Sequence, residues 1–377
     1  MTGDWTCATS SKDGLSTTIN KRGFVVKPSA RSWLFGLTVS LAVVVSAGDA
    51  MGQQQDTQTA VPRFLVLPAT NAEWTPLTEA IPIWTYDWTY SGQAYSAAIV
   101  GSAPAGDAET TIPVFLIPVR IEVAGETFNP KTVQSNGRTA IVNTQASPLF
   151  KNIPFEEAGT DLGDTQYIDA YQRANFWSST STNPNWHTRL GTPTVLPIQT
   201  VKVPPGDGQV AVEFGVTVAL ADDDFFDAEV QKFLKKFPQI TANSIPIFMV
   251  YDTYLTDGGE CCVGGYHSYN GKQAYSVFSY IGTPGAFAED VAALSHELGE
   301  LVMDPFTNNY SPCGILEVGD PLEGDANYGT YPYVHHDFTY HLQDLTFITY
   351  FGAPAATSLD SRTTFQGKSL GVCANGS

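Results

Sequence analysis

Glycine and proline interrupt this chain so often that long regular elements have little room. The 377 residues include 33 Gly and 24 Pro, and both residue types favour turns over the interiors of helices and strands. Charged residues make up only 15% of the chain and hydrophobic residues 43%, a balance that argues against disorder and supplies a sizeable core. We therefore expect an α+β protein with many short strands and few helices.

Several segments have the composition of strands bounded by turn signals. Ser91-Gly92 indicates a hairpin within the first of them. Pro113 and Pro118 make the second an edge strand or two shorter strands, and Gly215 indicates a bulge in the third. The segments are residues 84–101, 111–125, 209–220, 244–255 and 273–282.

Two helices are expected before residue 285. Residues 164–177 begin with Asp164 as a plausible N-cap. Residues 222–240 carry acids in the first turn and lysines in the last, an order that complements the helix dipole. The apolar residues of this second helix form one stripe, as in a packed scaffold helix. They are Phe226, Val230, Phe233, Leu234 and Phe237.

Residues 1–52 have the features of an export signal. Basic residues precede the apolar run Trp33–Val45, and small residues then allow cleavage after Ala50 or Gly52. The run is short for a membrane span of ~20 residues, although an uncleaved membrane anchor is the alternative. Residues 53–80 are polar and are expected to form a flexible arm.

The charge of the chain limits its partners. The formal net charge is −19 at pH 7, which repels nucleic acid and anionic membranes. We expect a mature protein that binds neither, is soluble, and is secreted to the extracellular space or the periplasm.

Four cysteines remain after removal of the signal, and in an exported chain they indicate two disulfides. Because adjacent cysteines rarely bond each other, we expect Cys261 and Cys262 to reach separately to Cys313 and Cys373. A zinc cluster is the alternative, but the spacings do not match the common zinc-finger patterns.

The sequence His296-Glu297-Leu298-Gly299-Glu300 resembles the H-E-x-x-H motif of zinc hydrolases, with glutamate in place of the second histidine. His296 and Glu300 lie one helical turn apart, so both can bind one zinc ion. Glu297 is placed to accept a proton from water at that ion. An ordinary packed helix is the alternative. The expected apolar stripe on the opposite side consists of Phe287, Val291, Leu294, Leu298 and Leu301.

A third ligand must come from elsewhere in the chain. Glu317 is the first choice because it follows an apolar pair and could project from a short strand or helical turn. Asp320, Glu323 and His341 are the alternatives. Zn²⁺ is the expected ion. Mn²⁺ and Ca²⁺ are the less favoured alternatives, because hard, oxygen-rich sites prefer them.

Other histidines and tyrosines have weaker signals. His267 follows two glycines in "GGYHSYNG", and we interpret it as a loop histidine near a disulfide. Tyr310, His335 and Tyr340 are candidates to donate hydrogen bonds to an oxyanion.

Several segments together resemble a group of secreted, mostly uncharacterised bacterial and fungal proteins with an H-E-x-x-E helix and a downstream glutamate. A weaker resemblance is to the phosphate-induced (exordium-like) secreted proteins. The segments are "DVAALSHELGELVMDPFTNN", "LEVGDPLEG", "YHLQDLTFITYF", "CCVGGYHSY" and "TDLGDTQYIDAYQRANFW".

The resemblance implies a zincin-like mixed sheet with an active-site helix in residues 222–377, preceded by a β-rich part in residues 81–221. It also implies His296, Glu300 and Glu317 as metal ligands and Glu297 as the base. The expected function is a secreted zinc-dependent hydrolase of the metallopeptidase type, acting on protein or peptide. The alternative is a non-catalytic secreted or surface protein that keeps a structural metal helix and binds a wall component.

Overall fold

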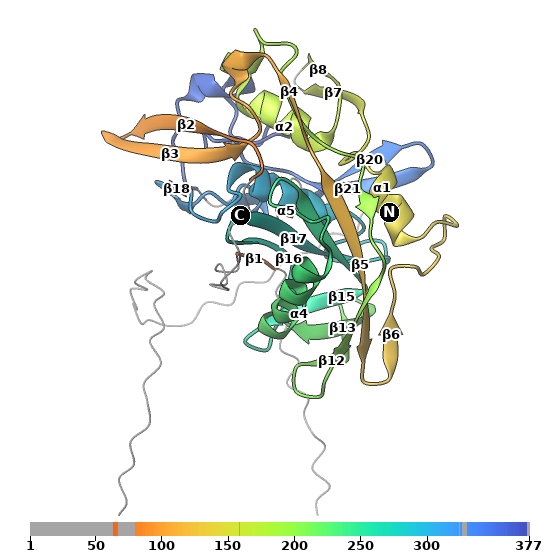
Figure 1. Ribbon diagram of the computed structural model, residues 1–377. Helices are drawn as coiled ribbons and strands as arrows, with labels where there is room; N and C mark the ends of the chain where they lie inside the picture. Colours follow the sequence, from red (N-terminus) through yellow and green to blue (C-terminus); the bar gives the residue numbers. More distant parts are fainter. Residues whose placement is uncertain (1–62, 67–79, 158, 324, 326–329, 375–377) are drawn as a thin grey trace, which may run out of the picture. The chain divides into compact units, whose positions relative to one another are not determined.

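Eleven strands form one mixed sheet (Figure 1). The computed structural model describes residues 63–66, 80–157, 159–323, 325 and 330–374, so the predicted signal and most of the predicted arm lie outside it. The main path of the sheet is β10-β5-β14-β17-β16-β15-β13-β12. The strands are β1 (Arg63–Val66), β5 (Val114–Val123), β6 (Glu126–Phe128), β10 (Thr194–Val195), β11 (Gln199–Val203), β12 (Gly208–Glu213), β13 (Val216–Asp222), β14 (Ile245–Tyr251), β15 (Thr253–Asp257), β16 (Glu260–Asn270) and β17 (Gln273–Tyr280).

The other strands of the described residues pair in twos. They are β2 (Ile83–Tyr90) with β3 (Gln93–Val100), β4 (Glu109–Ile112) with β9 (His187–Leu190), β7 (Ile153–Glu157) with β8 (Thr160–Thr165), β18 (Tyr310–Ser311) with β19 (Gly314–Ile315), and β20 (Thr330–His335) with β21 (Phe338–Gln343). The predicted mixed α/β character, mostly strands with a β-rich amino-terminal part, is confirmed.

Helices are few and mostly short, as the density of glycine and proline predicts. The α-helices are α1 (Ala140–Ala146), α2 (Tyr167–Asn175), α3 (Trp177–Thr180), α4 (Asp223–Lys236) and α5 (Ala292–Met303). The 3₁₀ helices are η1 (Pro104–Gly106), η2 (Asp320–Leu322), η3 (Ala355–Thr357) and η4 (Leu359–Ser361). Within the part of the chain that the structure describes, none of these has the length and apolar character of a membrane span.

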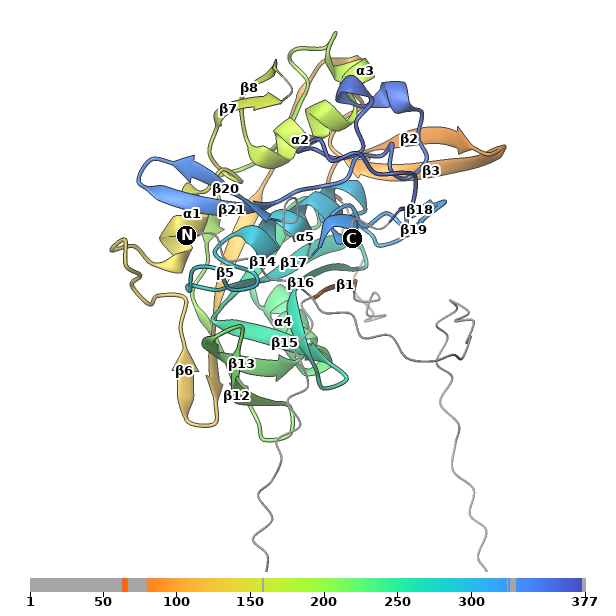
Figure 2. The ribbon, with the colours of Figure 1, turned by 180° about the vertical axis from the view of Figure 1, so that it is seen from behind.

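The large sheet has an apolar face on each side, because successive side chains of a strand point in opposite directions. In β14, Met249 belongs to the core that includes α5, and Phe248 to the core that includes α4. The two helices lie on opposite sides of β16 and β17 (Figures 1 and 2). In β16, Tyr266 points toward α4 and donates to Asp227 at 2.9 Å. Its neighbour His267 therefore points toward α5.

One predicted helix is confirmed, although it ends at Lys236 rather than residue 240 and leaves Phe237 beyond its last turn. The start of the other is corrected. In α4, the side chain of Asp222 accepts a hydrogen bond from the backbone N–H of Phe225 at 3.0 Å, and the last turn ends in Lys236. Helix α2 begins at Tyr167 rather than near Asp164. Asp164 belongs to β8, where it pairs with β7. The residue that was expected to cap the helix is therefore part of a strand.

Pro113 divides the predicted segment into β4 and β5, as the alternative of two shorter strands predicted. The other alternative, an edge strand, was wrong, because β5 lies inside the sheet. Pro118 pairs with Met249 of β14. On the other side of β5, β10 ends opposite Leu116 and β11 begins opposite Val119. Pro118 thus falls in the gap between two short neighbours, where its missing N–H leaves no carbonyl unpaired. The pairing of β5 with β14 also joins segments from both sides of the predicted domain boundary at residue 221.

Two-residue turns explain two of the glycines. The hairpin predicted at Ser91-Gly92 is confirmed, with φ values of 50° and 82° between β2 and β3. Gly215 is not a bulge: with Phe214 it forms the turn between β12 and β13, at φ values of 78° and 48°. Positive φ at both central residues is typical of the tight turns that match the twist of a hairpin.

The cysteines pair differently from the prediction. Cys261 bonds to Cys262, and the peptide bond between them is cis, while Cys313 bonds to Cys373. The carboxyl-terminal segment lies beside Tyr350, whose carbonyl oxygen accepts a bond from the N–H of Cys373 at 3.2 Å and lies 3.5 Å from Cys313 Sγ. This contact brings Cys313 and Cys373 together, so Cys261 and Cys262 have only each other as partners among the described cysteines.

The Cys313–Cys373 disulfide joins residues 60 positions apart and so restricts the unfolded chain. We expect Cys373→Ser to lower the free energy of unfolding by about 2–4 kcal/mol. Cys313→Ser should cause the same loss, and the double variant no more than either one. Denaturant unfolding of the oxidised protein measures this. Losses that simply add in the double variant would contradict a shared bond.

Candidate metal centre

Helix α5 carries His296, Glu297 and Glu300 and is buried along its whole length. It ends at Met303, before Asp304-Pro305, because a proline disfavours helical geometry at the residue before it. It begins at Ala292, so Phe287 and Val291 precede it rather than belonging to its apolar stripe. The side of the helix that carries the motif is covered by protein, since Gly299 lies against the side chain of Leu345 with no room for a Cβ.

The ring of His296 is held mainly by packing. It stacks on Phe64 of β1 with ring centroids 3.8 Å apart, and the backbone of Gly319 lies so close that a Cβ there would overlap the ring. Nε2 is 3.1 Å from Glu300 Oε1 and 3.5 Å from Asp320 Oδ1. Neither ring nitrogen has hydrogen-bond geometry with a described residue. Since Nδ1 lies against Gly319, Nε2 is the nitrogen that remains available to another ligand.

His267 is the residue of this site that the sequence analysis missed. It lies in strand β16, not in a loop, and is fully buried. Its Nδ1 is 3.4 Å from Glu297 Oε2 and 3.5 Å from Glu300 Oε2. The glycines before it are strand residues whose lack of a side chain lets neighbouring side chains pack close to the backbone. A Cβ at Gly265 would lie 2.9 Å from Glu297 Oε1. In the sequence these two glycines suggested a loop, but in the structure they mark a place where side chains pack closely on the strand.

Glu300 lies between the two histidines and is only 1% exposed. Its Oε1 faces His296 and accepts a hydrogen bond from the backbone N–H of Gly319 at 3.1 Å. Its Oε2 faces His267. Each oxygen of one carboxylate is therefore directed to a different histidine.

The return segment after α5 brings three further acids to this region. Glu317 is buried, and neither of its carboxylate oxygens has a hydrogen-bond partner among the described residues. The side chain of Asp320, at the start of η2, is 48% exposed. Glu323 follows η2, and its Oε1 is buried and likewise without a described partner.

Burial and mutual repulsion shift the protonation of these acids. Burial raises the pKa of Glu297 to about 7 and that of Glu323 to about 8. Burial, and then the charge of Glu300, raises the pKa of Glu317 well above its ordinary value. Although burial acts in the opposite direction, His296 and His267 lower the pKa of Glu300. These shifts favour the protonated form of Glu297, Glu317 and Glu323 and the ionised form of Glu300.

The histidines respond to the same charges. Burial lowers the pKa of each ring, but the carboxylates around them outweigh it and raise both values well above the ordinary one, led by Glu317 for His267 and by Glu300 for His296. The carboxylates therefore favour the protonated form of both rings. Metal binding to such groups would displace those protons.

The donor atoms fit a divalent cation. Buried polar atoms are normally hydrogen-bonded, yet several here lack a partner in the described part of the chain. They are Nε2 of His267, both ring nitrogens of His296, Oε1 of Glu297, both carboxylate oxygens of Glu317 and Oε1 of Glu323. Every ion pair that these acids make with a described residue is with a histidine, so no lysine or arginine among them supplies the balancing charge.

Two groups of possible ligands share Glu300. One consists of His296, Glu300 and Asp320, the other of His267, Glu300 and Glu317, with the ligand atoms of each group within 4.8 Å of one another. The structure thus brings the predicted ligand Glu317 to Glu300, in company with His267 rather than His296.

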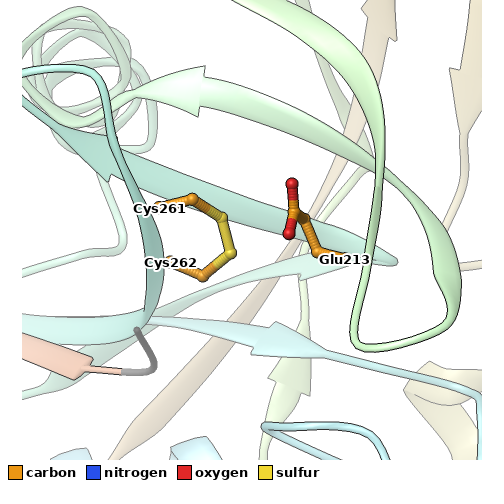
Figure 3. A group of neighbouring side chains, drawn as sticks. All are labelled: Glu213, Cys261 and Cys262. Carbon is orange, nitrogen blue, oxygen red and sulfur yellow. A yellow bond between two sulfur atoms is a disulfide. The ribbon is translucent and has the colours of Figure 1, made fainter. Parts of the chain in front are cut away.

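A further group includes the adjacent cysteines. Glu213 lies beside Cys261 and Cys262 (Figure 3). Because the two sulfur atoms are bonded to each other, they are not thiolates, and the thiolate is the form of cysteine that binds metals. This group is a disulfide with a neighbouring acid.

His341, one alternative for the third ligand, belongs to a separate group. Its Nδ1 is 2.7 Å from Asp290 Oδ2, and its backbone N–H donates to Asp290 Oδ1 at 3.0 Å. Glu289 completes the group. Asp290 is satisfied by these bonds, so the arrangement is explained without an ion.

The predicted oxyanion donors gain no support. Tyr310 is 62% exposed on β18, the ring of His335 lies against that of His336, and Tyr340 packs on Phe338.

Comparisons with known proteins add no assignment: no family model, no curated protein and no solved structure matches the chain. The zincin-like fold and the resemblance to secreted H-E-x-x-E proteins therefore stay predictions.

Gly319→Ala tests the packing that positions His296. The added Cβ would overlap the imidazole, so the ring or the return segment must move, and we expect zinc affinity to fall about 10–100-fold, as for other changes behind a metal ligand. Competition with a chromogenic chelator measures it. Gly106→Ala, whose Cβ would meet no atom within 4 Å, is the matched control. Equal affinity in both variants would contradict the proposed positioning.

Proposed function

We propose that this protein is a metal-dependent hydrolase, with zinc as the ion and peptide as the substrate. The observation that supports the proposal is the buried cluster around Glu300, in which histidine and carboxylate atoms without hydrogen-bond partners converge and no described lysine or arginine balances the charge. A protein core tolerates such a cluster when a cation compensates it.

The chain's own residues have separable roles in this proposal. His296 and Glu300 hold the ion, which supplies Lewis-acid chemistry and makes water a better nucleophile. Glu297 is the general base: it is fully buried next to His267, and its Oε1 has no described hydrogen-bond partner. A carboxylate in that position can accept a proton from water and return it to a leaving amine.

Strand β1 supports peptide as the substrate class. Leu65 and Val66 pair with Tyr266 and His267 of β16, which also pair with β17 on their other edge. An extended segment therefore fits along β16 directly beside the cluster, in the manner by which peptides add to a sheet edge. Phe64 of this segment stacks on His296.

Export is part of the same proposal. Its support is the composition of residues 1–52 together with the disulfides, since disulfides persist mainly in oxidising compartments.

The burial of the cluster favours a second candidate function. Structural metal sites are closed, whereas catalytic sites keep an open position, and here His267, His296 and Glu297 are all fully buried. The second candidate is a non-catalytic exported binding protein in which the ion only stabilises the fold. Hydrolysis of an unstructured protein, with and without chelator, distinguishes the two.

Glu297→Gln separates the base from the ligands. We expect this variant to keep the metal content of the parent and to lose hydrolysis of an unstructured protein by about 10²–10⁴-fold. Glu229→Gln, on the outer side of α4 where Glu229 pairs with Lys232, serves as the matched control with parental activity. A fully active Glu297→Gln would remove Glu297 from the mechanism.

Removal of β1 should increase activity. In this proposal β1 occupies the position of a peptide substrate and leaves it free in only a fraction of the molecules. If that fraction is about one in ten, a chain that starts at residue 80 gains about tenfold in kcat/KM over one that starts at residue 53. Phe64→Ala in the longer chain should give part of this gain, and Phe225→Ala on α4 none. Equal rates in the two chains at equal metal content would show that β1 does not block the site.

A further inference from the structure

Glu300 presents its two carboxylate oxygens to two different histidines. Oε1 is 3.1 Å from His296 Nε2, and Oε2 is 3.5 Å from His267 Nδ1. Two ligand atoms of one tetrahedral zinc ion, each bonded at 2.0–2.1 Å, lie about 3.3–3.4 Å apart. The two spacings lie within about 0.2 Å of that separation, so an ion can be accommodated between Glu300 and each histidine after small side-chain movements.

Each of these positions has its own third ligand. Asp320 belongs to the group with His296, and Glu317 to the group with His267. The two groups share Glu300 alone, so a single ion does not collect both histidines. Glu317 is the stronger sign of the second position, because it is buried and both its oxygens lack a partner among the described residues.

Charge points in the same direction. The acids of the region are Glu297, Glu300, Glu317, Asp320 and Glu323. If all five were ionised, one divalent ion would leave most of this negative charge uncompensated, and Glu297, Glu300 and Glu317 are buried. Two ions would come close to balancing it, and buried charge is tolerated when it is balanced.

We propose that the centre holds two metal ions bridged by Glu300, one bound by His296 and Asp320 and the other by His267 and Glu317. In two-metal hydrolytic sites the ions lie roughly 3.5–4 Å apart and stabilise the attacking and the leaving oxygen together. The proposal rests on the proposed function for its catalytic meaning, but its stoichiometry can be measured whether or not the protein hydrolyses peptides.

Metal stoichiometry tests the proposal. The chain from residue 53 is dialysed against buffered Zn²⁺, and bound zinc per chain is measured by inductively coupled plasma mass spectrometry. We expect two ions in the parent, one in His267→Ala, one in His296→Ala, and two in the control His341→Ala, whose ring belongs to the Asp290 group. One ion in the parent, or two in His267→Ala, would overturn the proposal.

A second measurement tests the bridging role of Glu300 in the parent protein. It needs no substitution of this buried residue, which would put folding at risk. With Mn²⁺ in place of zinc, a carboxylate bridge couples the spins of the two ions, and electron paramagnetic resonance of the parent should show an exchange-coupled pair. Spectra of isolated Mn²⁺ at full loading would contradict a bridge. Two coupled ions without any hydrolysis would refute the proposed function and leave the two-metal centre standing.

Discussion

Glu300 is a carboxylate with almost no access to water, and the surroundings of α5 are organised around it. A strand supplies His267 on one side, and the return segment supplies the backbone N–H of Gly319 on the other, at 3.1 Å from Oε1. Burying a charge is costly unless the charge is matched. Its two neighbouring histidines are shared with other acids, because Glu297 interacts with both rings and Glu317 with that of His267. The metal ion that we propose would supply the balancing charge.

Strand β16 connects this centre to the scaffold. Tyr266 and Tyr275 of the neighbouring strand both donate to Asp227 of α4, at 2.9 and 2.7 Å. These bonds fix the strand on the face of the sheet away from the centre. Because alternate side chains point to opposite faces, the bonds that hold Tyr266 also direct His267 toward α5. A change in strand register would move both residues together.

Sequence reasoning could find the helical part of the site because its geometry is local. An i, i+4 pair on a helix lies on one face whatever surrounds it, so His296 and Glu300 were identified, and Asp304-Pro305 marked the helix end. His267 could not be found in this way. Its strand is buried on both faces, so hydrophobic alternation, which would have shown a strand, is absent.

Tertiary contacts decided the remaining differences. Pro118 is tolerated inside the sheet because two short strands meet beside it, and no local pattern encodes that gap. The pairing of Cys313 with Cys373 depends on the return of the chain past Tyr350. The acids after α5 were recognised as candidates, but their division between the two histidines depends on the path of the return segment over the helix.

The central claim is that a metal ion compensates the charge around Glu300, and metal analysis of the parent protein tests it most directly. The chain from residue 53 is purified without added metal, its metal content is measured, and its melting temperature is compared with and without chelator. Since an ion bound only to the native state stabilises it, we predict stoichiometric metal and a lower melting temperature in chelator. A metal-free protein whose melting temperature is unchanged by chelator would contradict the account.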